Sequence, residues 1–111
     1  MLIRNYKSLV EMKESNFKKI QIEDADFIIL KEVLLKYPYK FYAYGSRVSG
    51  EAKKYSDLDI YCKEKMRGMD LIELKMDLED SDITIKVDVL DVDSCSSEFR
   101  EIIEQDLVEI R

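Results

Sequence analysis

The 111-residue sequence has no histidine and no tryptophan, one proline, three glycines and two cysteines. The absence of histidine excludes Ser-His-Asp and Cys-His nucleophilic mechanisms and any metal site with imidazole ligands. Cys62 and Cys95 do not have the Cys-x-x-Cys spacing of zinc or redox sites, so we expect two reduced thiols in a cytoplasmic protein. Chemistry performed by this chain must therefore depend on carboxylates, with or without a metal ion.

Long apolar runs are also missing, and with them the expectation of a membrane span or a secretory leader. Hydrophobic residues make up 46% of the chain and charged residues 38%, a composition typical of one globular domain. The net charge of -6 argues against binding along a nucleic-acid duplex. It does not exclude a nucleotide substrate, because a bound Mg²⁺ supplies local positive charge.

The apolar pattern predicts helices alternating with strands. We expect helices over residues 24–37, 46–52, 67–79 and 97–105, and strands over 40–44, 57–62, 83–90 and 107–110. Residues 1–22 are interpreted as an N-terminal extension and residues 23–111 as the single domain. Helix residues expected to face the core include Ile28, Ile72, Phe99 and Ile102.

The Gly45-Ser46 pair stands where a predicted strand ends and a short helix opens. Unpaired backbone N–H groups and the helix dipole at such a turn favour a phosphate. The alternative is that these residues serve turn geometry alone. The spacing of Gly45 and Gly50 resembles a P-loop, but Glu51 and Ala52 stand where that motif needs Lys and Ser or Thr, so a P-loop is excluded.

Asp57 and Asp59 share one face of a predicted strand, with Cα atoms roughly 6–7 Å apart. Leu58 and Ile60 form the opposite, buried face. Two carboxylates at this spacing can bind a hard cation together. The alternative is an exposed strand face on which both acids are simply solvated.

Asp88 lies in the predicted strand over residues 83–90, where it shares a face with Thr84 and Lys86. If this strand adjoins the one with Asp57 and Asp59, three carboxylates gather on one face and repel each other unless a cation is present. Such a patch suits two Mg²⁺ ions, and the third carboxylate can accept the proton of an attacking hydroxyl. Alone, Asp88 would be an ordinary polar residue on a half-exposed strand. The later acids of this region, residues 91 and 93, are interpreted as loop or helix-capping residues.

Taken together, these motifs resemble the polymerase-beta-like nucleotidyltransferase superfamily: Gly45-Ser46, then Ser56-Asp57-Leu58-Asp59-Ile60, then Val87-Asp88-Val89. Within it, the chain is most similar to the small minimal nucleotidyltransferase (MNT) domains, over roughly residues 24–110. The resemblance implies an α/β (α+β) fold, with a small mixed sheet flanked by helices and an open acidic face. It also implies transfer of a nucleoside monophosphate from an NTP to a hydroxyl.

The resemblance implies roles for the phosphate-binding residues. Gly45 and Ser46 would hold the triphosphate, with Arg47 leaning toward the phosphates and the Ser56 hydroxyl bracing the turn before the acids. The sequence does not distinguish ATP from other NTPs.

The resemblance likewise assigns the acids. Asp57 and Asp59 would bind both Mg²⁺ ions, while Asp88 would bind the catalytic ion and help to deprotonate the acceptor. The same positions would serve Mn²⁺, and the sequence does not separate the two metals.

Many MNT domains resemble antitoxins of HEPN/MNT toxin–antitoxin pairs, in which the MNT protein adenylylates a tyrosine of a HEPN ribonuclease. The sequence contains no helical acceptor domain of the aminoglycoside nucleotidyltransferase kind, so we expect a partner protein or a second copy in a homodimer to supply the acceptor site. The leading hypothesis is a Mg²⁺-dependent, ATP-using antitoxin. The alternatives are a non-catalytic antitoxin that masks its toxin by binding, and a small-molecule nucleotidyltransferase. No nucleic-acid or membrane partner is expected.

Overall fold

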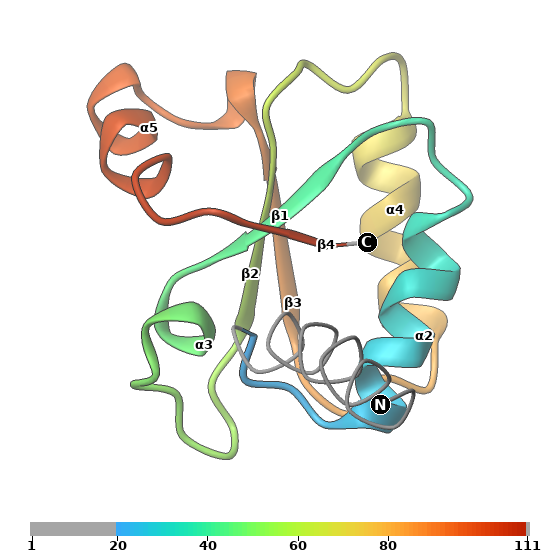
Figure 1. Ribbon diagram of the computed structural model, residues 1–111. Coiled ribbons are helices and arrows are strands. Elements are labelled where there is room, and N and C mark those ends of the chain that lie inside the picture. Colours follow the sequence, from blue (N-terminus) through green and yellow to red (C-terminus); the bar gives the residue numbers. More distant parts are fainter. Residues whose placement is uncertain (1–19, 111) are drawn as a thin grey trace, which may run out of the picture.

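The computed structural model describes residues 20–110, so residues 1–19 of the predicted extension lie outside the described part of the chain. Its elements follow in the order α2 (Asp24–Leu34), β1 (Phe41–Tyr44), α3 (Ser46–Ser49), β2 (Leu58–Cys62), α4 (Asp70–Asp80), β3 (Val87–Asp91), the 3₁₀ helix η1 (Val92–Ser94), α5 (Ser97–Ile103) and β4 (Val108–Ile110) (Figure 1). Among these residues, no helix has the length and apolar character needed to cross a bilayer, and the cytoplasmic location stays a prediction.

The four strands form one sheet in the order β3-β2-β1-β4. β1 runs antiparallel to both β2 and β4, whereas β2 and β3 run parallel. A parallel pair needs a long crossover, which α4 provides between β2 and β3. The predicted small mixed sheet is therefore confirmed. The two acid-bearing strands adjoin, which meets the condition for gathering the acids on one face.

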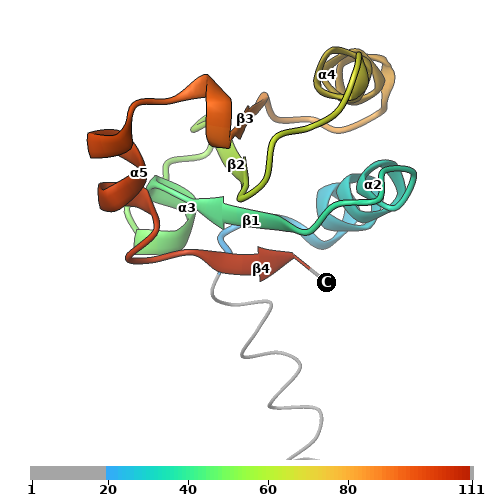
Figure 2. The same cartoon turned by 90° about the horizontal axis from the view of Figure 1, so that it is seen from above.

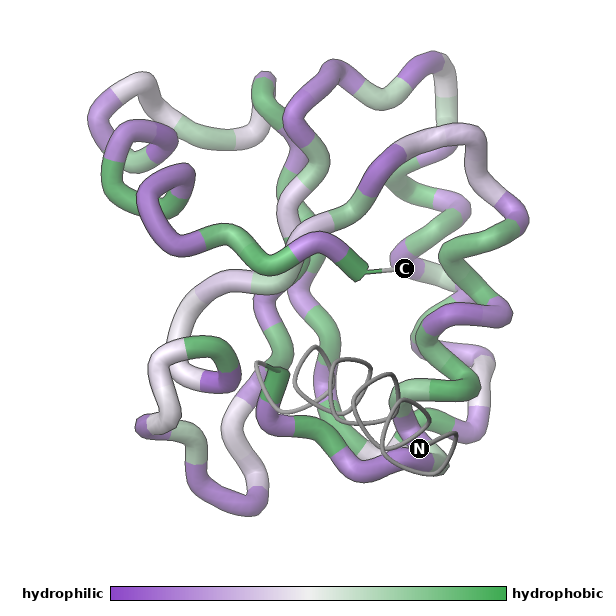
Figure 3. The backbone as a smooth tube through the Cα atoms, in the orientation of Figure 1, coloured by the Kyte–Doolittle hydropathy of each residue, from purple (hydrophilic) through white to green (hydrophobic). Residues whose placement is uncertain are grey.

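Helices α2 and α4 cover one face of the sheet (Figure 2). The core between them contains fully buried side chains from helix and strand alike, including Leu30, Leu58, Ile60, Leu74 and Val89. Along the strands, hydrophobic positions alternate with hydrophilic ones (Figure 3), as expected for a sheet with one fully covered face. This alternation sends the acidic positions to the face opposite α2 and α4.

That opposite face is partly covered by α5. Tyr44, Tyr61 and Ile103 are buried together there in a second, smaller cluster. Strand alternation places Tyr61 on the same face as Asp59, but Tyr61 is fully buried and its hydroxyl donates to Glu104 (3.1 Å). The open part of this face is therefore smaller than the sequence indicated.

The strand predicted over residues 83–90 was only half right. β3 begins at Val87, because Thr84 in the preceding segment bonds to helix α2. Thr84 donates from its backbone N–H (2.8 Å) and its hydroxyl (2.6 Å) to the buried Asp26 carboxylate of α2. At the other end, Asp91 was predicted to lie in a loop or to cap a helix; it is the buried last residue of β3 and stands at the N-cap position of η1.

Four helix residues predicted to face the core are exposed instead. The exposed side chains are Ile28 of α2, Ile72 of α4, and Phe99 and Ile102 of α5. Each helix buries only the stripe that meets the sheet, and the seven-residue α5 buries only Ile103. Helical periodicity alone therefore predicted a wider buried stripe on each helix than the packing against the sheet allows.

Candidate functional site

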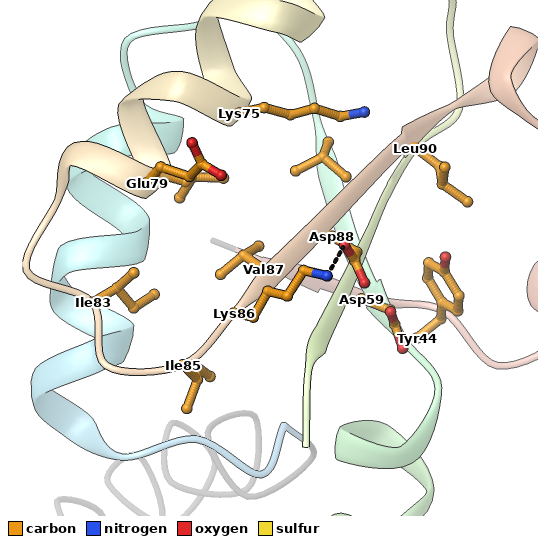
Figure 4. Close-up of a pocket in the computed structure, with 12 residues that line it drawn as sticks. Tyr44, Asp59, Lys75, Glu79, Ile83, Ile85, Lys86, Val87, Asp88 and Leu90 are labelled. Carbon is orange, nitrogen blue, oxygen red and sulfur yellow. Dashed lines mark ion pairs between the residues drawn. The ribbon is translucent and has the colours of Figure 1, made fainter. Parts of the chain in front are cut away.

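Asp59 and Asp88 lie side by side on neighbouring strands. They are register partners in the parallel pairing of β2 with β3, and both are half-buried. Partners in register point to the same face, about 4.8 Å apart along the hydrogen-bonding direction. Asp57 immediately precedes β2, where the Leu58 N–H bonds to the Lys86 carbonyl (2.9 Å). Figure 4 shows the Asp59 and Asp88 carboxylates turned to the same side of the sheet.

The electrostatics of Asp59 favour a cation. Burial raises the pKa of Asp59 above its ordinary value, and the charges of Asp88 and Asp57 raise it further. Each of these effects penalises the ionised form, and a cation bound at the carboxylates would reverse the penalty. Asp59 thus experiences electrostatic repulsion from the other two carboxylates and is not a separately solvated group.

Gly45 brings the chain unusually close to this acid. Tyr44, the last residue of β1, is the register partner of Asp59, so the turn that follows lies beside the carboxylate. The backbone of Gly45 has φ +82°, and a Cβ atom added there would stand 2.6 Å from Asp59 Oδ2. Only glycine combines that backbone angle with that approach. Ser46 then begins α3, so the turn beside Asp59 leads directly into this short helix.

Arg47 contacts backbone carbonyls, and the contact with phosphates that the resemblance implied stays a prediction. Its side chain is buried, and the guanidinium donates to the carbonyls of Ser56 (2.9 Å) and Lys54 (3.2 Å) and to that of Gln21. The Ser56 hydroxyl accepts a hydrogen bond from the Lys53 N–H (2.8 Å). Arg47 and Ser56 therefore both shape the loop that leads into the acids.

Two further side chains line the acidic face and were not assigned a role from the sequence. Tyr44 is buried beside Asp59 and packs edge-on against Phe99, with ring centroids 6.3 Å apart. Burial, followed by the nearby Asp59, raises the pKa of Tyr44 to about 12. Lys86 lies with its Nζ atom 3.8 Å from Asp88 Oδ1. The alternation of residues 84, 86 and 88 placed Lys86 on the correct face, but spacing could not show that the two side chains pair.

Residues 29–110 match the model of the family described as polymerase beta, nucleotidyltransferase. The chain belongs to this family. A relative named "Probable protein adenylyltransferase MntA", from Haemophilus influenzae, is 39% identical over 101 residues, which cover 87% of this chain and 89% of the relative. The predicted membership in the polymerase-beta-like nucleotidyltransferases is confirmed, and the chain is a nucleotidyltransferase.

The donor set of this nucleotidyltransferase suits Mg²⁺ by its chemistry. Carboxylate oxygens are the hard ligands that Mg²⁺ prefers, and the ion commonly combines a few of them with substrate phosphates. Within residues 20–110, however, no three acidic or thiol side chains converge closely enough to form a preassembled metal site. Joint binding by Asp57, Asp59 and Asp88 would therefore require their side chains to turn toward the ion.

Proposed function

We propose that this chain transfers AMP from ATP to a tyrosine of a partner HEPN ribonuclease in a Mg²⁺-dependent reaction, and so acts as the antitoxin of a toxin–antitoxin pair. The observation that carries the proposal is the pairing of Asp59 with Asp88 in register, directly beside the Gly45-Ser46 turn. The name of the H. influenzae relative supports a protein as the acceptor. The HEPN partner and the tyrosine come from the resemblance to MNT antitoxins.

The acids and the turn would divide the work of binding. Asp57 and Asp59 would hold two Mg²⁺ ions, and Asp88 would hold the ion nearest the attacking oxygen. Bound Mg²⁺ neutralises phosphate charge and orients the reacting oxygens. Gly45, which has no side chain, lets the backbone of the turn approach the Asp59 carboxylate closely, and Ser46 offers its hydroxyl at the start of α3.

The chemical step would be an in-line displacement at the α-phosphorus. The tyrosine oxygen forms a bond to that phosphorus, the bond from the α-phosphorus to the bridging oxygen breaks, and pyrophosphate leaves. The Asp88 carboxylate accepts the phenolic proton. The main contributions of the chain are the placement of the reactants and the fixed charges around them.

The test is incubation of the purified chain with α-labelled ATP, Mg²⁺ and the protein encoded beside it. The chain carries a matched control, because Asp80 and Asp82 repeat the Asp-x-Asp spacing, are exposed, and do not line the groove of Asp59 and Asp88. We expect label on the partner with the wild type and with the Asp80→Ala/Asp82→Ala variant, and none with Asp57→Ala/Asp59→Ala.

The other outcomes separate the alternatives. Equal silencing of the partner by wild type and by Asp57→Ala/Asp59→Ala, with no label transferred, would identify a non-catalytic antitoxin. Label that appears on an added small-molecule alcohol but never on the partner would identify a small-molecule nucleotidyltransferase.

A further inference from the structure

Lys86 is fixed at the edge of the acidic face. Its backbone carbonyl accepts the Leu58 N–H (2.9 Å), which holds Lys86 beside the first residue of β2. Lys86 and Asp88 are two residues apart in extended chain, so their side chains leave the backbone on the same side. The ammonium reaches Asp88 Oδ1 at 3.8 Å (Figure 4).

This ion pair lies in the groove that Asp59 and Asp88 line together with Tyr44. The side chain of Lys86 is 71% exposed and that of Asp88 46% exposed, so water screens the pair and little free energy holds it together. A weak pair of this kind opens readily. Its ammonium is therefore an exchangeable counter-ion, not a fixed structural partner.

The carboxylate that Lys86 neutralises is the one assigned to the catalytic Mg²⁺. A divalent ion at Asp88 would compete with the ammonium for the same oxygens and would be repelled by it at close range. Lys86 thus offsets one negative charge of the acidic face when no metal is present. It also disfavours the binding of a divalent ion in the absence of nucleotide.

We propose that Lys86 is an exchangeable counter-ion that pairs with the Asp88 carboxylate in the metal-free protein and yields it to the metal, so that it lowers the affinity of the nucleotide-free protein for a divalent ion. The inference rests on the proposed function, because it takes Asp88 as a metal ligand. It adds to that function a side chain of the protein itself, Lys86, that competes with the metal for the Asp88 carboxylate.

The experiment measures Mn²⁺ binding to the nucleotide-free full chain, using the electron paramagnetic resonance signal of unbound Mn²⁺. The variants are Lys86→Met, which keeps the length of the side chain without its charge, and Asp88→Asn. Lys75→Met is the matched control, because Lys75 is exposed and lines the same groove from α4. Urea unfolding of each variant confirms that it is folded under the conditions of the titration.

We expect Lys86→Met to bind Mn²⁺ about fivefold more tightly than the wild type, and Lys75→Met to remain within about 1.5-fold. Asp88→Asn should weaken binding. An unchanged affinity in Lys86→Met, with Asp88→Asn still weakened, would overturn the role of Lys86 alone. An equal gain in Lys75→Met would also overturn it, because the effect would then be one of overall charge. A wild type whose Mn²⁺ binding is indifferent to Asp88→Asn would overturn both this inference and the metal site of the proposed function.

Discussion

At the scale of single residues, the tightest approach in the site joins Gly45 to Asp59. Gly45 has φ +82° and ψ -155°, a region that residues with a side chain rarely occupy. Gly50 also has positive φ (+85°), but a Cβ atom there would meet nothing within 4 Å. Substitution of Gly50 therefore tests backbone strain alone, whereas substitution of Gly45 tests strain together with contact with Asp59.

We predict that Gly45→Ala lowers the unfolding free energy by about 1–3 kcal/mol and the transfer rate by about tenfold or more, because the new methyl group displaces the Asp59 carboxylate. Gly50→Ala should cost about 1–2 kcal/mol and leave the rate nearly unchanged. Urea unfolding and label-transfer rates of both variants provide the measurement. Equal rates in the two variants would show that the contact with Asp59 does not matter.

Arg47 leads to a second prediction at this scale. Its guanidinium serves the carbonyls of Gln21, Lys54 and Ser56 at once, and a lysine ammonium cannot match that planar set of donors. Arg47→Lys should therefore lower the unfolding free energy by about 2 kcal/mol, while Arg67→Lys on the exposed surface should change it little. A fully stable Arg47→Lys variant with weakened nucleotide binding would instead favour a phosphate-binding role.

At the scale of elements, the site depends on the register of β2 against β3. Alternating hydrophobicity placed Asp59 and Asp88 on the polar faces of their strands, and this part of the prediction follows from the pleat alone. The family resemblance implied that the two strands are neighbours, and the structure shows that they run parallel. The extent of β3 could not be read from alternation, because Asp26 of α2 captures Thr84 through tertiary hydrogen bonds.

The contacts of the polar side chains could not be predicted from the sequence either. The family resemblance implied that Arg47 leans toward phosphates, whereas only the fold brings the carbonyls of residues 21, 53, 54 and 56 around its guanidinium. Tyr61 lies on the same strand face as the acids, but it is buried by packing against α5, which is distant in the sequence. Sequence pattern gives the face of a side chain, and tertiary structure decides what covers that face.

Asp91 gives a pH-dependent prediction for the end of β3. Its buried carboxylate accepts hydrogen bonds from the Ser94 hydroxyl (2.7 Å) and the Met66 N–H (3.0 Å). Burial acts to raise the pKa of Asp91, but these hydrogen bonds outweigh it and hold the pKa below its ordinary value. The stabilisation is therefore present above the unfolded-state pKa, about 3.9, and is lost as the pH falls through the lower pKa of the folded state.

We predict that Asp91→Asn costs about 1–3 kcal/mol of unfolding free energy near neutral pH and reduces the loss of stability in acid. The matched control is Asp93→Asn, whose exposed carboxylate pairs only weakly with Lys65 (3.5 Å). Urea titrations between pH 3 and pH 7 measure both effects. An acid transition unchanged in Asp91→Asn would contradict this assignment.

At the scale of the whole molecule, a chain of net charge -6 concentrates three acids beside one turn. A ligand that binds only the folded state stabilises it by about 2.7 kcal/mol at 100 times its Kd. For a domain of this size we predict that Mg²⁺ with ATP raises the Tm by roughly 10 °C, and that EDTA abolishes the shift. The shift should persist in Asp80→Ala/Asp82→Ala and vanish in Asp57→Ala/Asp59→Ala. An equal shift in both variants would place the nucleotide elsewhere.

The central claim is that the acidic face transfers a nucleoside monophosphate to a protein. The most direct measurement compares ATP labelled at the α-phosphate with ATP labelled at the γ-phosphate, each incubated with the wild-type chain, Mg²⁺ and the partner protein. We predict that only the α-label becomes covalently attached to the partner, while the γ-label appears in pyrophosphate. Attachment of the γ-label, or of neither label while ATP and metal are bound at the acids, would contradict it.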